Sequence, residues 1–239
     1  MIDEGNPLIS DASLDMYDLA NGFMPAPQWT AYDPAFVKRY RAAQIERVAR
    51  IDARARALIS DQLDAEATRG DPAFAALPAA RQRSTMRRAS FQPIMTVYRT
   101  MANPNYVDKA LDPSNRAYGC LLSDRPDLMN FQLMGFGRVQ IPDAWLSTWS
   151  DISSNANLLK NGHAITEPAV VVNAGRDMDV YPETHSKAIF NALGSQDKTY
   201  IEFPDNLHYF EPGEGEADNA GALLQMARLI PWLEARAPL

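Results

Sequence analysis

An aspartate and a histidine each follow a short segment that has the composition of a buried strand. Asp177 comes three residues after the apolar run 169–174, and His208 comes five residues after the run 199–203. Active groups of parallel sheets gather beyond the carboxyl ends of the strands, so we expect both side chains there. A carboxylate that holds one imidazole nitrogen fixes the ring tautomer, while the other nitrogen takes a proton from a nucleophile. The pair therefore predicts the acid–base part of a hydrolytic triad.

The C-terminal third of the chain alternates strands and helices. The β-branched run 169–174 is typical of a strand that is buried on both faces. A helix over 184–193, a strand over 199–203 and a final helix over 217–235 follow it, which predicts a right-handed parallel crossover. In the final helix we expect these apolar residues to face inward: Ala220, Leu223, Leu224, Ala227, Ile230 and Leu233.

The sequence before this region predicts an N-terminal loop followed by helices. Residues 1–33 form turn-like clusters without a sustained period, which indicates an extended loop. Asp33 suits a helix N-cap and Pro34 the first helical position, and apolar residues then recur at steps of three or four. The segment 66–90 indicates a loop followed by a short basic helix. We expect residues 34–160 to be mostly helical, with short connections.

Composition and charge narrow the class of protein. The chain has 239 residues, of which 46% are hydrophobic, enough for a folded core. Its formal charge of −7 argues against general nucleic-acid binding. The arginine-rich helices lack interleaved aromatic residues, so we expect salt contacts or solvent exposure there. A phosphate or nucleic-acid site is the minor alternative, and it predicts steeply salt-dependent binding.

Further features point to a soluble cytoplasmic protein without cofactor or metal. The single cysteine, Cys120, cannot form an internal disulfide, which favours a reducing compartment. No apolar run approaches the roughly 18 to 20 residues of a spanning helix, and the N-terminus lacks the pattern of a signal peptide. The three histidines are dispersed, so no metal site is predicted. We expect His163 and His185 to be ordinary surface or capping residues.

The stretch 165–236 resembles the closing portion of the α/β-hydrolase fold: strand, acid loop, helix, strand, histidine loop and terminal helix. In that family the acid usually comes nine positions after a proline like Pro168, which implies Asp177 as the acid and His208 as the base. Asp179 is the alternative acid, because the glycine and proline around the loop lie about one position later than in the common pattern. Turn capping is the alternative role for both aspartates.

The earlier region resembles a group of little-characterised bacterial α/β-hydrolases through DMYDLANGF, FVKRYRAAQIERVARIDARARALI, LLSDRPDLMNFQL and AWLSTWSDISSNA. The resemblance implies a helical cap over residues 1–160 and the C-terminal part of a hydrolase core over 161–239, a partial α/β fold. On their own terms, four aromatic residues are candidates to line an apolar pocket for a small-molecule substrate: Phe131, Phe136, Trp145 and Trp149. The alternative is that they are simply core.

The family's nucleophile elbow, GxSxG or a variant, is missing from this chain, as is the glycine motif of the oxyanion hole. Cys120 follows a glycine, but no strand pattern leads into it, so we expect an inert buried thiol.

Only two strands are evident, from a sheet that normally has eight. The interpretation is therefore the C-terminal part of a longer hydrolase, starting at an internal methionine and acting on a small ester or related acyl substrate. The nucleophile type (Ser, Asp or Cys) and homo-oligomerisation are left open. The alternative is a non-catalytic binding or interaction module.

Overall fold

A computed structural model describes residues 11–132, 137–211, 217 and 220–236. The chain forms two compact units, and each is assembled from separate stretches of sequence. The first comprises Met1–Asn21, Asp33–Ala102 and Leu128–Ala156, and the second comprises Gly22–Tyr32, Asn103–Asp127 and Asn157–Leu239. The expected division after residue 160 lies near the last break between the units. The stretches 22–32 and 103–127, which were expected in the cap, belong to the second unit.

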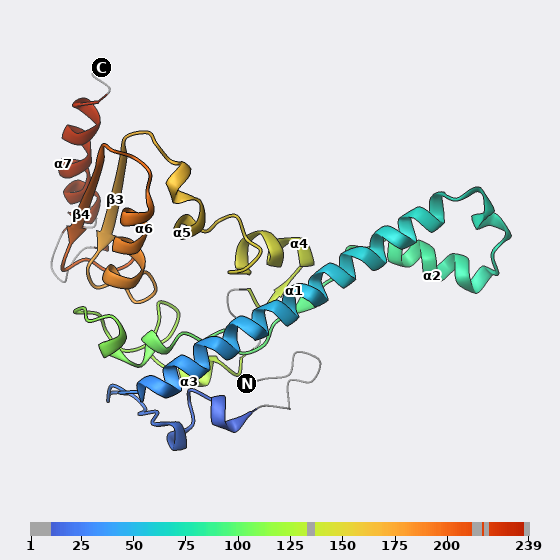
Figure 1. Ribbon diagram of the computed structural model, residues 1–239, viewed down its shortest axis with the longest axis horizontal. Coiled ribbons are helices and arrows are strands. Elements are labelled where there is room, and N and C mark those ends of the chain that lie inside the picture. The colour runs from blue at the N-terminus through green and yellow to red at the C-terminus, as the bar shows by residue number, and fades with distance from the viewer. Residues whose placement is uncertain (1–10, 133–136, 212–216, 218–219, 237–239) are drawn as a thin grey trace. The chain divides into compact units, whose positions relative to one another are not determined.

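Two helices dominate the first unit (Figure 1). Helix α1 spans Pro34–Gly70, and the Asp33 carboxylate accepts hydrogen bonds from the first amides of the helix, as predicted. Helix α2, Ala79–Ser90, is the predicted short basic helix. It packs back along α1, where Arg88 forms an ion pair with Asp61.

The expectation of a mostly helical region up to residue 160 is wrong after α2. Five prolines interrupt residues 91–160. Asn and Asp side chains also cap short turns there; for example, the Asn103 side chain accepts a hydrogen bond from the amide of Asn105. The regular elements are short: β1 (Met95–Thr96), β2 (Val139–Gln140), α3 (Pro126–Met129), α4 (Pro142–Ala144), a π-helical turn (Trp145–Trp149) and α5 (Leu158–Asn161). Strands β1 and β2 pair antiparallel.

Single 3-10 turns complete the irregular segments. They lie at Ala12–Leu14, Leu19–Asn21, Pro72–Ala76, Pro104–Tyr106, Lys109–Leu111 and Gly162–Ala164. The first two fall within the region expected to be loop. Within the part of the chain that the structure describes, no helix is both long and apolar enough to cross a membrane.

A buried carboxylate ties the first unit together. Asp52 of α1 accepts hydrogen bonds from Trp145 Nε1 at 2.7 Å, from Ser150 Oγ at 2.9 Å and from Ser153 Oγ. Trp145 itself packs in a buried apolar cluster together with Ile51, Ala55, Met95 and Val97. Because three donors converge on one carboxylate, Asp52 fixes the segment that follows α4 against α1.

Replacing Asp52 by alanine should therefore destabilise the first unit. The change leaves one indole N–H and two hydroxyls without their acceptor, which costs about 3 kcal/mol. Asp61→Ala is the matched control on the same helix, because it removes only a half-exposed ion pair and should cost at most about 0.5 kcal/mol. Urea unfolding of both variants measures the difference. Equal losses would show that the Asp52 contacts do not stabilise the unit.

The second unit contains the predicted parallel crossover. Strand β3 (Ala169–Ala174) pairs in parallel with β4 (Lys198–Phe203), from Ala169 opposite Lys198 to Ala174 opposite Phe203. A π-helical turn (Pro182–Lys187) and helix α6 (Ala188–Ala192) connect the strands. Helix α7 (Ala220–Glu234) follows β4. The coarse expectation of strand, helix, strand and helix is confirmed.

Alternation along β4 directs its side chains to two different helices. The ammonium of Lys198 donates to main-chain carbonyls at the end of α6, including Phe190 O at 2.9 Å. Thr199 points to the opposite face, where its hydroxyl accepts from Trp232 Nε1 of α7 at 2.9 Å. The two helices therefore lie on opposite faces of the strand pair (Figure 1).

The predicted inward face of α7 is wrong. Leu223, for example, is 57% exposed, and Leu224, Ile230 and Leu233 are exposed as well. The more buried positions are Ala220, Gly221, Gln225, Leu229 and Trp232, so only Ala220 of the predicted inward residues is partly buried. The helix is apolar on nearly all sides, so its periodicity does not identify the side that faces the strands.

Candidate acid–base site

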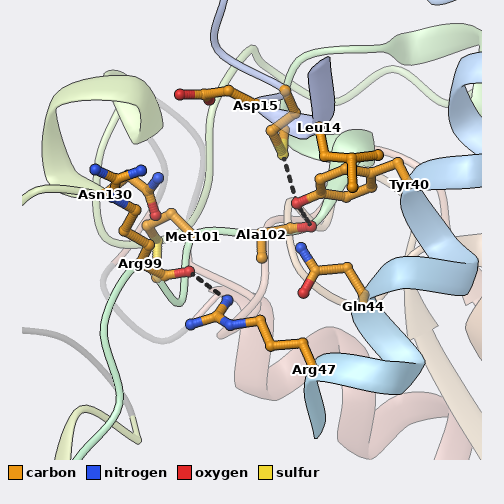
Figure 2. Close-up of a pocket in the computed structure, with 10 residues that line it drawn as sticks. Leu14, Asp15, Tyr40, Gln44, Arg47, Arg99, Met101, Ala102 and Asn130 are labelled. Atoms are coloured by element: carbon orange, nitrogen blue, oxygen red, sulfur yellow. Dashed lines mark hydrogen bonds between the residues drawn. The ribbon is translucent and has the colours of Figure 1, made fainter. Parts of the chain in front are cut away.

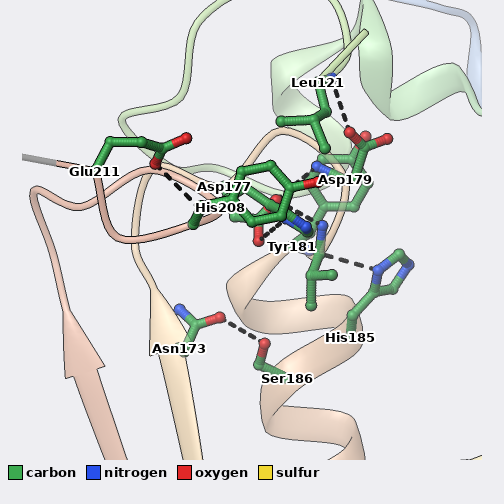
Figure 3. Close-up of polar contacts among 11 residues, drawn as sticks. Leu121, Asn173, Asp177, Asp179, Tyr181, His185, Ser186, His208 and Glu211 are labelled. Carbon is green, nitrogen blue, oxygen red and sulfur yellow. Dashed lines mark hydrogen bonds and ion pairs between the residues drawn. The ribbon is translucent and has the colours of Figure 1, made fainter. Parts of the chain in front are cut away.

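The structure brings Asp177 and His208 together at the carboxyl ends of the two parallel strands (Figure 3). His208 Nδ1 lies 2.8 Å from Asp177 Oδ2. The side chain of Asp177 is only 6% exposed, whereas that of His208 is 26% exposed. The pair is thus buried at its acid end and open to solvent at its imidazole end.

The acid loop fixes one oxygen of the Asp177 carboxylate, Oδ1, and leaves Oδ2 for His208. Oδ1 accepts hydrogen bonds from the amide of Asp179 at 2.8 Å and from the amide of Val180 at 3.0 Å. A carboxylate that already serves as an acceptor takes the third hydrogen bond from a donor, so we assign the proton of His208 to Nδ1. Nε2 is then the nitrogen that is able to accept a proton.

Glycine is required where the acid loop meets the histidine loop. A Cβ atom on Gly175 would lie 2.6 Å from Pro204 Cα, closer than real Cβ contacts permit. The close approach allows two main-chain hydrogen bonds, from Gly175 N to Phe203 O at 2.8 Å and from Arg176 N to Asn206 O at 3.0 Å. These contacts hold the two loops side by side.

The histidine loop is a compact turn. Phe210 has a positive φ of 56°, a strained conformation for a residue other than glycine, and its amide donates to Leu207 O at 2.9 Å. The Phe210 ring packs edge-on against Phe203 at the end of β4. Tyr209 packs edge-on against the imidazole of His208, with the ring centroids 4.6 Å apart.

Asp179, the alternative acid, lies elsewhere in the same loop. Its Oδ2 accepts a hydrogen bond from the amide of Leu121 at 2.7 Å. The carboxylate that meets His208 is therefore that of Asp177. The role of Asp179 as an anchor was missed from the sequence, because its partner is 58 residues away.

Among the described residues, none forms a hydrogen bond with His208 Nε2. Within the described ranges, the structure thus pairs a carboxylate with an imidazole but places no nucleophilic side chain in hydrogen-bond contact with Nε2. Cys120 belongs to the same unit and is buried. Burial raises the pKa of the Cys120 thiol, which keeps it in the unreactive protonated form.

The thiol of Cys120 should therefore react slowly with iodoacetamide. At pH 8 we expect native protein to be alkylated at least about 100-fold more slowly than protein unfolded in urea, because alkylation requires an exposed thiolate. Mass spectrometry of timed samples measures both rates. Rapid alkylation of the native protein would make Cys120 a candidate nucleophile.

The other two histidines are not part of this pair. The ring of His185 packs against Tyr181, and its Nδ1 lies 3.4 Å from the amide of that residue. The exposed His163 contacts the carbonyl of Lys160 through Nδ1 at 3.1 Å. Across the described ranges, no group of three or more histidine, cysteine, aspartate and glutamate residues is arranged to hold a metal ion.

Stability of the second unit should depend on pH through His185. Burial lowers the pKa of His185 below its ordinary value of 6.5, and the nearby carboxylates only partly oppose this shift. The unfolded chain therefore binds the proton more readily, so the free energy of unfolding should fall as the pH drops below about 6.5.

Each proton taken up on unfolding contributes at most about 1.4 kcal/mol per pH unit. His185→Gln should reduce the loss of stability between pH 7.5 and 5.5, as measured by amide exchange in β3 and β4. His163→Gln serves as an exposed control. Identical pH profiles for wild type and His185→Gln would contradict this assignment.

The predicted aromatic pocket residues lie in the first unit. Trp145 belongs to the buried core, so for this residue the core alternative holds. Trp149 and Phe131 are 44% and 66% exposed, and the guanidinium of Arg99 lies 4.9 Å from the Phe131 ring centroid. Phe136 is outside the described residues. A substrate pocket built from these side chains stays a prediction.

A cavity of about 660 Å³ lies in the second unit, and neither Asp177 nor His208 is among the residues that line it. Arg176 and Leu207, the chain neighbours of Asp177 and His208, contribute to its wall. Further lining residues come from the end of β4 and from α7, including Glu202, Phe203, Leu224 and Arg228. Sequence reasoning missed this cavity, because its loop residues have the composition of ordinary turns.

The first unit has a much smaller cavity of about 30 Å³ (Figure 2). Tyr40 lines it and donates to Ala102 O at 2.8 Å, while Arg47 donates to Arg99 O at 3.2 Å. Burial raises the pKa of the Tyr40 hydroxyl, which keeps it a neutral donor. The volume suits ordered water rather than an organic substrate.

No family model matches the sequence, and searches among curated proteins and among solved structures find no match. The fold is thus described by its own elements, a helical unit and a unit with a parallel strand pair. Inferences about activity depend on the geometry of the site.

Proposed function

We propose that Asp177 and His208 are the acid–base half of a hydrolase of the α/β-hydrolase type, acting on a small ester or related acyl substrate. The proposal requires a nucleophile, and none of the described residues forms a hydrogen bond with His208 Nε2. The observation that carries the proposal is the 2.8 Å contact between His208 Nδ1 and Asp177 Oδ2, which leaves Nε2 able to accept a proton.

In this mechanism His208 acts as general base and then as general acid. Nε2 takes the proton from the nucleophile as it attacks the acyl carbon, and the resulting imidazolium returns the proton to the leaving group. The carboxylate of Asp177 stabilises the imidazolium. Its burial strengthens that interaction, because water screens a buried pair less than an exposed one.

The proposal of a small substrate is supported by a cavity whose wall includes Arg176 and Leu207, the chain neighbours of Asp177 and His208. Its volume of about 660 Å³ is within the range of roughly 300 to 1,000 Å³ that is typical of ligand sites. The wall combines apolar side chains such as Leu207 and Leu224 with charged side chains of both signs: Arg176, Arg228, Glu202, Asp205 and Glu211. An acyl group and a polar leaving group would both find suitable contacts there.

Hydrolysis of p-nitrophenyl acetate by the purified chain tests the role of the histidine. This activated ester needs little assistance, so His208 can promote its hydrolysis without a dedicated nucleophile. We expect His208→Ala to lower the rate by at least about tenfold, because general-base catalysis alone contributes 10²- to 10⁴-fold in complete enzymes. Asp177→Ala should lower it less, and His163→Ala, at an exposed histidine, should leave it unchanged.

Equal rates for wild type and His208→Ala would remove the support for a hydrolase. That result would favour the second candidate, a non-catalytic binding or interaction module in which the pair only fastens two loops. The observation in favour of this candidate is that Nε2 has no nucleophile beside it among the described residues. In that case His208→Ala should lower the stability of the second unit while leaving ester hydrolysis unchanged.

A further inference from the structure

We infer that Asp179 is a positioning residue for the relay, which it controls by anchoring the acid loop. Its carboxylate binds the amide of Leu121 at 2.7 Å. The amides of Asp179 itself and of Val180 bind Asp177 Oδ1. The catalytic meaning of this role rests on the proposed function, although the geometry can be tested without it.

The contacts form one continuous chain from the anchor to the base. Leu121 N holds the side chain of Asp179, which fixes where the main chain runs at residues 179 and 180. The two amides at these positions set the orientation of the Asp177 carboxylate, at 2.8 and 3.0 Å. Asp177 Oδ2 in turn holds His208 Nδ1 at 2.8 Å. Loss of the first contact should therefore loosen the last.

The amide of Leu121 belongs to a tight turn, which makes it a firm anchor. Cys120 and Ser123 exchange main-chain hydrogen bonds of 2.9 and 3.1 Å across this turn. Gly119 has a φ of +103°, and a Cβ atom there would lie 2.6 Å from Ser123 O, so only glycine fits. Its amide donates to Tyr106 O at 2.9 Å, which ties the turn to the preceding segment.

A second brace acts on the far end of the acid loop. Asp112 is fully buried, and its carboxylate accepts from the amide of Thr184 at 2.6 Å and from the hydroxyl of Thr184 at 2.7 Å. This contact secures the start of the crossover helix but does not touch the amides that hold Asp177. Asp112 therefore offers a matched control: a buried aspartate that binds the same connection without orienting the relay.

The tautomer of His208 is the quantity to measure, because it depends on whether Asp177 Oδ2 still accepts a hydrogen bond from Nδ1. Long-range ¹H–¹⁵N NMR spectra of the full chain, recorded well above the ordinary pKa of histidine, distinguish a proton on Nδ1 from one on Nε2. We expect the wild type to carry the proton on Nδ1. Asp179→Ala should shift His208 toward the Nε2–H form of a solvated histidine. Asp179→Asn should retain the wild-type tautomer, because its amide oxygen can still accept from Leu121.

Asp112→Asn provides the comparison for general destabilisation. It should lower the stability of the second unit and leave the tautomer of His208 unchanged. A His208 tautomer that is unchanged in folded Asp179→Ala, or equally changed in Asp112→Asn, would overturn the inference.

If Asp179→Ala does not fold, the Asp179→Asn variant decides the question. A neutral acceptor is weaker than a carboxylate, so amide exchange at residue 180 should be about threefold faster or more. Unchanged exchange would overturn the inference.

Asp177→Ala separates this inference from the proposed function. If Asp177→Ala changes the tautomer of His208 but Asp179→Ala does not, the relay stands and only the positioning role fails. If Asp177→Ala has no effect on the tautomer, the relay itself is wrong, and both proposals fail with it.

Discussion

Main-chain amides of the acid loop orient the Asp177 carboxylate for its hydrogen bond with His208. Two amides of the acid loop fix Asp177 Oδ1, and the other carboxylate oxygen is then left for the imidazole. This arrangement requires the loop to reverse its direction within three residues of Asp177. The loop therefore orients the carboxylate oxygen that contacts His208 Nδ1.

The parallel register of the strand pair brings the two loops to the same place. Ala174 is opposite Phe203, so the loops leave the strands at the same level and in the same direction. Gly175 then allows the main chains to approach, since any side chain there would collide with Pro204. A shift of the register by one residue would move His208 by about 3.3 Å and separate it from the carboxylate.

The features that could be predicted from the sequence are those that depend on residues close together in the chain. The cap at Asp33, the bounds of β3 and the candidates Asp177 and His208 all follow from residues that are close together in the chain. The face of α7, the role of Asp179 and the core position of Trp145 depend instead on partners that are distant in sequence. The mostly helical region expected up to residue 160 does not continue after residue 90, because proline and Asx turns outweigh apolar spacing there.

The side chains of Asp177 and His208 differ in solvent exposure, and this difference bears on the role of the pair. A histidine that only fastens two loops gains most when both of its nitrogens have protein partners, because an unpaired buried polar atom is costly. Here the acid is buried and two amides hold its carboxylate, while the imidazole is partly exposed. None of the described residues forms a hydrogen bond with Nε2, and this is the nitrogen that the proposed proton transfer uses. A buried acid with a partly exposed imidazole is the arrangement that the proposed proton transfer requires.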